Sequence, residues 1–569
     1  MSGPAQTLVV PDRQVAGISG SDGGTLMSDT ARSGSAAVDV QDADSQRLAA
    51  LGYRQELSRV LSLFENFGVA FCYLSPMVGI YSLFTLGAGS AGPRYLWLMP
   101  IVVFGQFLVS LVFAELGSHY PIAGALFHWS KNLINRGYGW WVGWIYGWAL
   151  IITVASVDTG FVIYASPLLH NLFGANINAA DPNTILFFTL LLLAVQTVFN
   201  VAGVRLLGSI SKIGVYVEIL GTFGIAILLA AVGFHHGIGF LFTTQGTETL
   251  AHNPLGVNFG GNWWLGAALV AILAHVYIFY GFESAGDVAE EVKSASRQVP
   301  RAIVSSLLIG GITSFILVGA LLLAIPSGGK SFTAATSLSG GVPYILSANV
   351  HVAGIQDFIL ILVCFAFFSC GTAVQGAGAR LAFSYARDRA IPGSHVLRYV
   401  SRRFKTPINA VLLAAILPAL FTLLVHLSPS KPIVVGFVTY PANVTPLTAL
   451  VSFGVSGIYL SFLMVVVAAV VARLRGWKAE GPFKLGIWAW PVLIGAMVYG
   501  AVMLANIVIP TGITSPKAEL FNFDWLTLLV MVFICLIGAL YFLAAHPHRR
   551  APEASQGQSA PPLGSVGGP

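Results

Sequence analysis

Charged residues are scarce in this chain. Asp, Glu, Lys and Arg make up 9% of its 569 residues, whereas an average soluble domain carries about 25%. Hydrophobic residues make up 56%, and the mean hydropathy is +0.78. This composition excludes an ordinary soluble domain and predicts an all-α integral membrane protein that is surrounded by the lipid bilayer.

Cysteine is also scarce, and the four cysteines all lie inside apolar runs: Cys72, Cys364, Cys370 and Cys535. No CxxC pair or Cys/His cluster has the spacing of a metal site. We therefore expect the thiols to pack as small hydrophobic groups. We also expect neither a metal nor another cofactor.

The sequence lacks the motifs of several other classes of protein. The net charge of +6 comes from basic residues scattered between apolar runs, which excludes a nucleic-acid-binding surface. No HExxH motif, phosphate-binding Gly-rich loop or Ser/His/Asp grouping appears, so we expect no enzyme activity. The first residues hold no basic stretch followed by an apolar one, so we expect no cleaved signal peptide.

Twelve apolar runs are long enough to cross a hydrocarbon core of roughly 30 Å as helices. We place them at 61–88, 95–117, 138–168, 185–203, 209–234, 263–288, 302–325, 352–384, 407–427, 446–472, 487–510 and 524–545. They form a membrane domain at 56–547. Residues 1–55 and 548–569 are polar or rich in Pro, Gly and Ser, and are predicted to be disordered tails.

The positions of Lys and Arg predict the orientation, because these residues accumulate on the cytoplasmic side. If both termini are cytoplasmic, all but four of the 29 basic residues lie on the inner side. The exceptions are Arg94, Lys330, Lys431 and Lys517. An added or missing span would reverse every later loop, so this asymmetry supports twelve spans in the cell membrane with both termini inside.

Two spans carry helix-breaking residues near their middles. The first contains Ser75–Gly79, which includes Pro76, and the sixth contains Tyr280–Ser284, which includes Gly281. Proline lacks a backbone donor and glycine tolerates non-helical dihedrals, so both segments can unwind. Twelve spans can form two repeats of six helices, or two repeats of five with two helices added. The matching breaks in the first and sixth spans favour five-helix repeats, 61–234 and an inverted 263–472, followed by helices 487–545. The sequence thus predicts discontinuous helices around a site in mid-membrane.

Several ordered motifs resemble permeases of the amino acid/polyamine/organocation superfamily, in particular its amino acid/choline transporter branch. They are Leu51–Leu57, Ser75–Gly79, Ala114–Leu116 with Pro121–Gly124, Gly281–Glu283 with Ala289–Glu291 and Pro300–Ala302, Ala386–Asp388 with Ile391–Pro392, and Gly481–Gly486. The similarity covers roughly residues 51–545. Ala125 and Phe127 depart from it, since relatives often have Gly and Tyr there.

The resemblance implies a LeuT-type inverted repeat that moves amino acids or related small amines by alternating access, with the substrate held at the two breaks. Unwound backbone must bind protein, water or ligand, because lipid offers no hydrogen bonds. The substrate carboxylate would accept N–H groups of 78–80, and its ammonium would donate to carbonyls freed nearby. The candidate binding residues are Tyr73, Ser75, Pro76, Met77, Val78, Gly79, Ile80, Tyr277, Tyr280, Gly281, Phe282 and Glu283.

Three buried ionisable residues are candidates for proton coupling. Glu283 lies in the second break, where it either contacts substrate, carries a proton or caps loose amides. Glu218 lies where related permeases can carry a lysine, and it has no basic neighbour one turn away, so proton transfer and structural packing stay open. His275 is either a proton carrier or a packing residue.

Other polar residues of the spans have weaker claims to a site. Ser369, Cys370 and Thr372 either line an ion site against the first span or mediate helix packing. We expect Asp158 and Asp357 at the outer helix ends.

Several functions fit these features. Proton-coupled symport, sodium coupling and amino acid exchange use the same scaffold, and similar permeases handle aminobutyrate, choline and ethanolamine. A nutrient sensor that binds without transport is a further alternative. The sequence leaves the substrate open among amino acids and amines.

Overall fold

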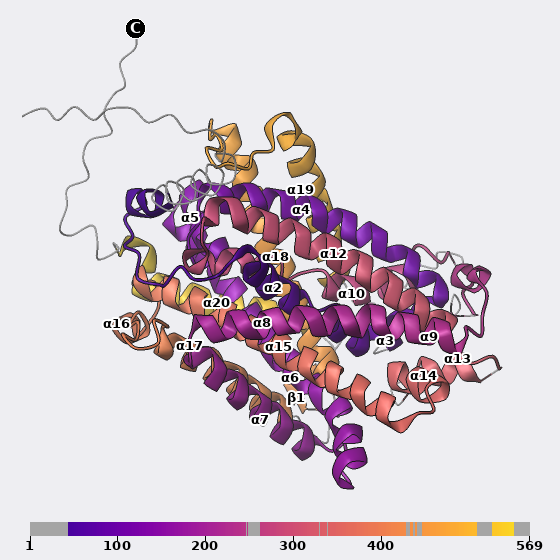
Figure 1. Ribbon diagram of the computed structural model, residues 1–569. Helices are drawn as coiled ribbons and strands as arrows, with labels where there is room; N and C mark the ends of the chain where they lie inside the picture. Colours follow the sequence, from indigo (N-terminus) through magenta and orange to yellow (C-terminus); the bar gives the residue numbers. More distant parts are fainter. Residues whose placement is uncertain are drawn as a thin grey trace, which may run out of the picture.

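The computed structural model describes residues 44–245, 247, 262–328, 330–337, 340–427, 433–435, 438–440, 446–508 and 526–550. The chain forms a bundle of long helices, as Figure 1 shows. The one sheet in the described part is an antiparallel hairpin of β1 (Ile433–Val435) and β2 (Val438–Tyr440). Apart from this hairpin, the expected all-α fold class is confirmed.

The helices of the first half are α2 (Leu63–Leu74), α3 (Pro76–Ala91), η1 (Pro93–Leu98), α4 (Met99–His119), α5 (Ala125–Leu133), α6 (Arg136–Phe173), α7 (Pro182–Val201), α8 (Val204–Ile219), the π-helical turn η2 (Leu220–Gly224), α9 (Ile225–Val232) and η3 (Ile238–Phe242). Those of the second half are α10 (Ala267–Ile278), α11 (Ser284–Asp287), η5 (Ala289–Glu291), α12 (Ala295–Leu323), α13 (Ser331–Ala335), α14 (Gly341–Asn349), α15 (Ala353–Arg387), α16 (Ser394–Leu397), α17 (Ile408–His426), α18 (Pro446–Leu474), η6 (Gly486–Trp488), α19 (Ala489–Val508), α20 (Leu526–Ala545) and η8 (Pro547–Arg549).

Within the described residues, 11 helices are long and apolar enough to cross a membrane. The expected run 263–288 corresponds instead to the shorter α10 followed by α11, because the helix stops at Ile278. Outward side chains such as Phe104, Phe187 and Ile416 are 64%, 61% and 54% exposed. Apolar side chains of this kind suit contact with lipid.

The helix α6 lies at the centre of the bundle and packs against α15 and α18. It runs for 38 residues, from Arg136 to Phe173. Asp158 therefore lies inside the helix and is fully buried, so the expectation that it sits at an outer helix end is wrong. Asp357 does lie in the first turns of α15, where Asn171 donates to it at 2.7 Å.

Both described ends of the chain lie at one end of the bundle, which we call the tail end (left in Figure 1). There the Arg47 guanidinium donates to the Ser118 carbonyl at 3.3 Å, and that of Arg550 donates to the Arg389 carbonyl at 3.4 Å. The opposite end, which we call the loop end, carries η1, α13 and α14.

The N-terminal segment differs from the expected tail. Residues 44–50 form a helix, and Leu48 and Tyr53 are buried against Ile122. The packed part of the chain therefore begins before residue 55. Residues 1–43 and 551–569, the rest of the two expected tails, lie outside the described residues.

Candidate functional site

The first helix break is confined to one residue. Ser75 ends α2 and begins α3 with a φ of 37° in the left-handed region. Pro76 occupies the first turn of α3, where its missing N–H costs no hydrogen bond. The Ser75 hydroxyl oxygen accepts the Val78 N–H at 3.2 Å and so caps the half-helix.

Glu218 from α8 completes this cap. Its carboxylate accepts a short hydrogen bond from the Ser75 hydroxyl and another, at 3.0 Å, from the Met77 N–H. The side chain is fully buried, and no basic group in the described part of the chain forms an ion pair with it. The Glu218 side chain thus already occupies the positive N-terminal end of α3. Phosphate and carboxylate groups bind at helix N-termini in the same way.

The helix that carries Glu218 is itself irregular at this level. The π-helical turn η2 begins two residues later, and the Thr222 hydroxyl donates to the Glu218 carbonyl at 2.7 Å. A Cβ on Gly221 would lie 2.1 Å from the Met77 sulfur. Glycine therefore permits η2 to lie directly against the first break, and π-turns are frequent at functional sites.

The second break is wider. Residues 279–283 are not helical, and Gly281 has a φ of 105°. A Cβ there would lie 2.8 Å from the Leu74 N, so glycine allows the second break to touch the end of α2. The Gly281 N–H donates to Glu283 at 2.8 Å, so this break is capped by a carboxylate of its own.

Glu283 and a second acid, Asp287, both contact the hydroxyl of Tyr146. The Tyr146 hydroxyl, on α6, lies 3.2 Å from Glu283 Oε1 and 2.8 Å from Asp287 Oδ2. A hydroxyl has one hydrogen, so both contacts are hydrogen bonds only when one of the two acids is protonated. The sequence interpretation considered Glu283 alone and missed Tyr146 and Asp287, although Asp287 lies one turn beyond Glu283.

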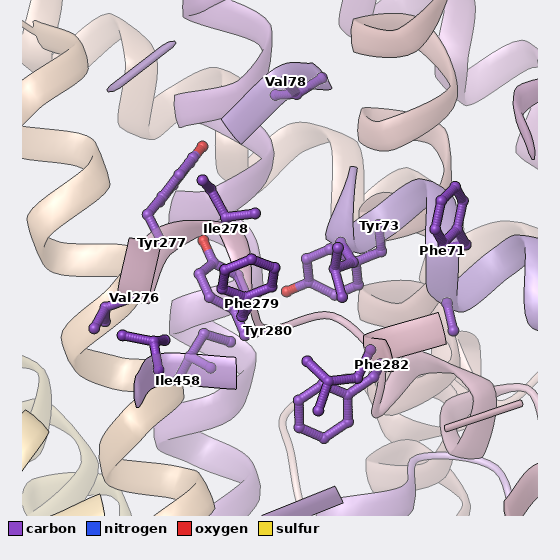
Figure 2. Packing of buried hydrophobic residues seen from close by; sticks show 14 of the residues in the cluster. Phe71, Tyr73, Val78, Val276, Tyr277, Ile278, Phe279, Tyr280, Phe282 and Ile458 are labelled. Carbon is purple, nitrogen blue, oxygen red and sulfur yellow. The ribbon is translucent and has the colours of Figure 1, made fainter. Parts of the chain in front are cut away.

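Three tyrosines lie between the breaks. The rings of Tyr73 and Tyr280 meet edge to face at 5.9 Å, and those of Tyr280 and Tyr277 do so at 5.8 Å (Figure 2). The Tyr73 hydroxyl is buried without a partner in the described part of the chain. Ser156 adds a hydroxyl 3.4 Å from that of Tyr277. These side chains form a buried wall of aromatic faces and hydroxyl groups.

The remaining candidate binding residues have packing contacts. A Cβ on Gly79 would lie 2.5 Å from an Ile278 side-chain carbon, so Gly79 permits α3 to pack on α10. Its N–H donates to the Ser75 carbonyl at 3.1 Å. Val78 and Ile80 are buried within α3, and Phe282 packs against Phe113 and Phe462. The amides of 77–79 are therefore already bonded within the protein in this state.

His275 packs against the loop end rather than the breaks. Its ring stacks on Tyr95 at 5.0 Å, and its Nε2 lies 3.1 Å from the Tyr95 carbonyl oxygen. These contacts account for a histidine buried in α10, although its Nδ1 has no partner among the described residues.

The candidate ion site on α15 has most of its groups bonded locally. The hydroxyls of Ser369 and Thr372 donate to carbonyls of their own helix, at 3.1 Å and 2.7 Å. The Cys370 thiol donates to the Tyr73 carbonyl at 3.4 Å, and so touches the end of α2. Cys370 thus contacts the last turn of α2, and Ser369 lies beside Cys72 of the same helix.

A buried polar network on α6, α7 and α15 was missed by the sequence interpretation. Gln196 donates to Asp158 at 2.7 Å, and Asn200 donates to Gln375 at 2.7 Å. A Cβ on Gly371 would lie 2.2 Å from the Gln196 amide nitrogen, so glycine makes room for the network. In the sequence, the one sign of this network was Asp158, an aspartate inside a predicted membrane span.

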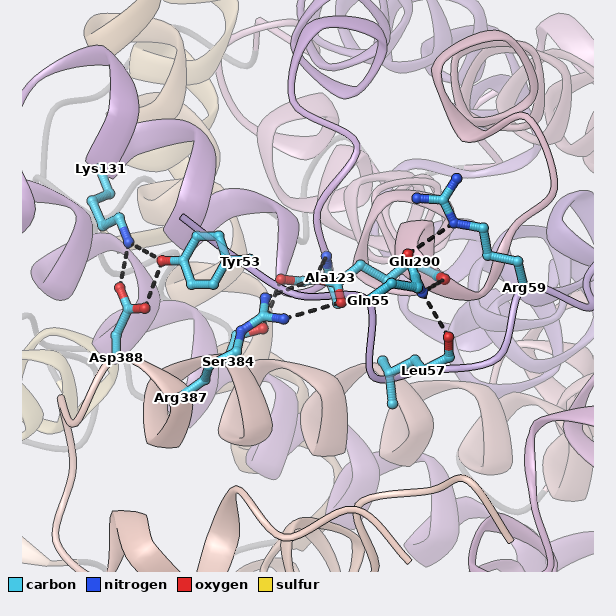
Figure 3. A network of polar contacts seen from close by, with 10 residues as sticks. All are labelled: Tyr53, Gln55, Leu57, Arg59, Ala123, Lys131, Glu290, Ser384, Arg387 and Asp388. Atoms are coloured by element: carbon cyan, nitrogen blue, oxygen red, sulfur yellow. Dashed lines mark hydrogen bonds and ion pairs between the residues drawn. The ribbon is translucent and has the colours of Figure 1, made fainter. Parts of the chain in front are cut away.

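The tail end holds a second set of carboxylates, each beside a cation (Figure 3). Arg387 binds Glu290 in two hydrogen bonds of 3.0 Å and 2.6 Å, and Lys131 contacts both Asp388 and Tyr53. Burial lowers the pKa of Lys131 from its usual range, and Asp388 opposes that shift. Burial and Asp388 together raise the pKa of Tyr53.

Two further buried ion pairs tie the tail end together. Arg380 of α15 binds Glu291 of η5 at 3.1 Å and 3.2 Å, and both side chains have no exposed surface. Arg473 of α18 contacts Glu115 of α4. Glu115 and the pairs around 290 and 387 lie in the motifs that carry the family resemblance, so these motifs encode packing at the tail end.

The comparisons with known proteins agree with this architecture. The Amino acid permease family model matches residues 61–535. The amino-acid permease BAT1 of Arabidopsis thaliana is 25% identical over 521 residues, which cover 88% of this chain and 94% of the relative. The choline transporter of Saccharomyces cerevisiae is 28% identical over 489 residues, which cover 82% of this chain and 79% of that protein.

A third relative, an uncharacterised amino-acid permease of Schizosaccharomyces pombe, is 27% identical over 524 residues, or 90% of this chain and 85% of the relative. The matched region contains both helix breaks and Glu218. The family suggested by the sequence motifs is therefore confirmed. A chain with this match and this many spanning helices is a multi-pass membrane protein, and it belongs to the amino acid permease family.

Proposed function

We propose that this permease is a proton-coupled secondary transporter that carries an amino acid or a related small amine by alternating access. In this proposal the chain crosses the cell membrane twelve times, with a LeuT-type repeat and with the tail end in the cytoplasm. Support comes from the two described exceptions to the charge bias, Arg94 and Lys330, which lie near the loop end.

The observation that carries the proposal is the position of Glu218. Its carboxylate accepts from the Ser75 hydroxyl and the Met77 N–H, which lie at the same end of α3 as the amides of 78–80 that the sequence assigned to a substrate carboxylate. Glu218 and substrate therefore compete for one anion-binding helix end. This competition gives a physical link between the state of Glu218 and substrate binding.

Protonation of Glu218 would loosen its contact with the break. A neutral acid accepts hydrogen bonds more weakly than a carboxylate, and it no longer benefits from the positive end of α3. Its departure would free the N-terminal end of α3 for the substrate. Return of the proton to the cytoplasm would restore the capped state observed here and expel the substrate carboxylate.

The substrate ammonium is assigned to the wall formed by Tyr73, Tyr277 and Tyr280. Aromatic faces attract cations, and the Tyr73 hydroxyl, which has no partner in the described part of the chain, can accept a hydrogen bond from an ammonium. The same wall suits the quaternary ammonium of choline, which makes a choline-like amine the second candidate substrate. One of the relatives carries the name choline transporter.

The test compares Glu218→Gln with wild type in proteoliposomes, across a panel of labelled amino acids and amines. Glutamine is a neutral mimic of the protonated acid, so uptake driven by a pH gradient should fail while exchange of internal for external substrate persists. Binding by the variant should also lose most of its dependence on pH.

Two variants serve as controls for this test. Glu283→Gln should weaken binding by about ten- to hundredfold, because a hydrogen bond to a charged group contributes roughly 1.5–3 kcal/mol. Glu480→Gln changes an exposed glutamate and should behave as wild type. If Glu218→Gln still concentrates substrate under an inward proton gradient, Glu218 is structural and the coupling group lies elsewhere, with Glu283 and His275 next to test.

A further inference from the structure

An apolar cavity lies on the outer side of the bundle, away from both helix breaks. It has a volume of about 320 Å³ and is lined by side chains of α6, α15, α16 and α17. Its walls include Trp144, Trp148 and Leu417, which are only partly buried. The cavity is therefore open to the bilayer that surrounds the bundle, and no residue of either break lines it.

The length of the cavity along the helices is close to the hydrocarbon thickness of one leaflet of the bilayer. Its lining extends from Gly143 to Val154 on α6 and from Val374 to Tyr385 on α15. Each run covers 11 residue steps, or about 16 Å at the rise of an α-helix. Half of a hydrocarbon core of roughly 30 Å is about 15 Å.

The cavity runs from the interior of the bundle to the tail end. At its deep end, Ile152 and Ala155 of α6 belong to an apolar cluster against which Phe421 of α17 and Ile534 of α20 pack. At the tail end the lining residues are Ile391, Pro392 and Leu397, which belong to the connection between α15 and α17. An occupant would enter from the leaflet surface and end within the bundle.

The connection that forms this mouth is strongly basic. Residues 389–405 contain five Lys or Arg residues and no acidic residue. Arg402, Arg403 and Lys405 are exposed there, just after the lining residue Leu397. An apolar slot of leaflet depth beneath a basic segment is complementary to one molecule in the membrane, a lipid with a negative headgroup.

We propose that this cavity binds one acyl chain of an anionic phospholipid, whose phosphate contacts the basic segment 389–405. A zwitterionic phospholipid would fill the slot equally well but would gain less from the basic segment. A basic segment that serves only to orient the chain in the membrane would show no preference between lipids.

One variant fills the cavity without strain. Gly378 lines the cavity on α15, and a Cβ there would meet only Ala414 and Leu150, at 3.8 Å and 3.9 Å. Gly378→Leu therefore places a side chain in the slot. The matched control is Gly354→Leu on the same helix, where a Cβ would meet nothing within 4 Å.

A second pair of variants tests the charge. Replacing Arg402, Arg403 and Lys405 by Gln removes three exposed positive charges beside the mouth. The control replaces Arg475, Lys478 and Lys484 by Gln, which removes three exposed charges from the connection between α18 and α19. All six changes are on the surface, so this arm tests the proposal even if Gly378→Leu fails to fold.

The measurement is native mass spectrometry of the full chain after equilibration with mixed vesicles of phosphatidylcholine and phosphatidylglycerol. Wild type and both controls should retain one phosphatidylglycerol, with about tenfold or greater preference over phosphatidylcholine. Gly378→Leu should lose the bound lipid, and the 402/403/405 variant should lose the preference. Equal retention of both lipids by wild type, unchanged retention by Gly378→Leu, or equal effects of the two charge variants would overturn the proposal.

Discussion

The buried carboxylates of the bundle centre and those of the tail end are held in opposite ways. At the centre, Glu218 and Glu283 accept from hydroxyls and backbone N–H groups, and no cation among the described residues is bonded to either. At the tail end, Glu290 and Glu291 each receive two hydrogen bonds from an arginine. Only the tail-end carboxylates thus require a charged partner to stay buried.

This difference separates carboxylates that can change their protonation state from carboxylates that cannot. A carboxylate held by neutral donors can take up a proton with modest rearrangement, because no positive charge is left unpaired. An ion pair in an apolar interior resists protonation, since breaking it leaves the partner charge buried alone. The centre is therefore suited to coupling, and the tail end is suited to locking helices together.

The largest effect should come from separating a tail-end pair. Arg380→Met leaves Glu291 buried without its partner and should destabilise the protein by about 3–5 kcal/mol, measured as unfolding in detergent. The double variant with Glu291→Met should recover most of this loss. Glu218→Gln, by contrast, should cost about 1–2 kcal/mol, because it weakens hydrogen bonds but leaves no buried charge without a partner. A loss for Glu218→Gln as large as that for Arg380→Met would remove the distinction.

A smaller effect should follow from changes at Ser75, which holds both α3 and Glu218. Ser75→Ala removes the cap of Val78 and one donor to Glu218, and should cost about 2 kcal/mol in unfolding. Ser75→Gly also loses the hydroxyl but tolerates the φ of 37°, so it should recover about 1 kcal/mol. Ser82→Ala, at a buried hydroxyl without a partner among the described residues, is the neutral control.

Local signals in the sequence predicted the breaks but not their contacts. Proline beside Ser75 and glycine at 281 act within a few residues, so both breaks lie where the sequence placed them. The pairing of Glu218 with Ser75 joins residues 143 positions apart, and no local pattern reports it. The same reason explains why the amides of the first break, expected to await a substrate, are already bonded to Ser75 and Glu218.

The sequence also failed to predict where some helices and packed segments begin and end. Apolar length placed the end of the third span near residue 168, whereas α6 continues to Phe173, so Asp158 changed from an expected surface residue to a buried one. Polar residues in 44–55 suggested a disordered tail, yet Tyr53 bonds Asp388 at 2.6 Å across the tail end. A partner supplied by a distant helix makes a polar segment stable in a packed position, and composition alone does not reveal that partner.

The smallest predicted effect concerns pH. Stability should depend on a histidine of the tail end, whereas substrate binding should depend on the bundle centre. His128 of α5 lies at the tail end beside Tyr53, Lys131 and Arg387, and neither ring nitrogen has a partner in the described part of the chain. Burial, followed by the charges of Lys131 and Arg387, lowers the pKa of His128 well below 6.5. Below pH 6.5 the unfolded chain therefore binds a proton that the folded chain does not. The contribution of His128 to stability is complete above that pH and falls by about 1.4 kcal/mol per unit below it.

His128→Phe keeps an aromatic ring beside Tyr53 and removes the titration. The difference in unfolding free energy between wild type and this variant should thus change by about 1.4 kcal/mol between pH 7.5 and pH 5.5, in favour of the variant at low pH. His395→Phe alters an exposed histidine of α16 and should leave the wild-type pH dependence unchanged. Because His128 is remote from Glu218, substrate binding by His128→Phe should retain its full pH dependence. If that dependence disappears with His128, proton sensing belongs to the tail end and the assignment of coupling to the bundle centre is wrong.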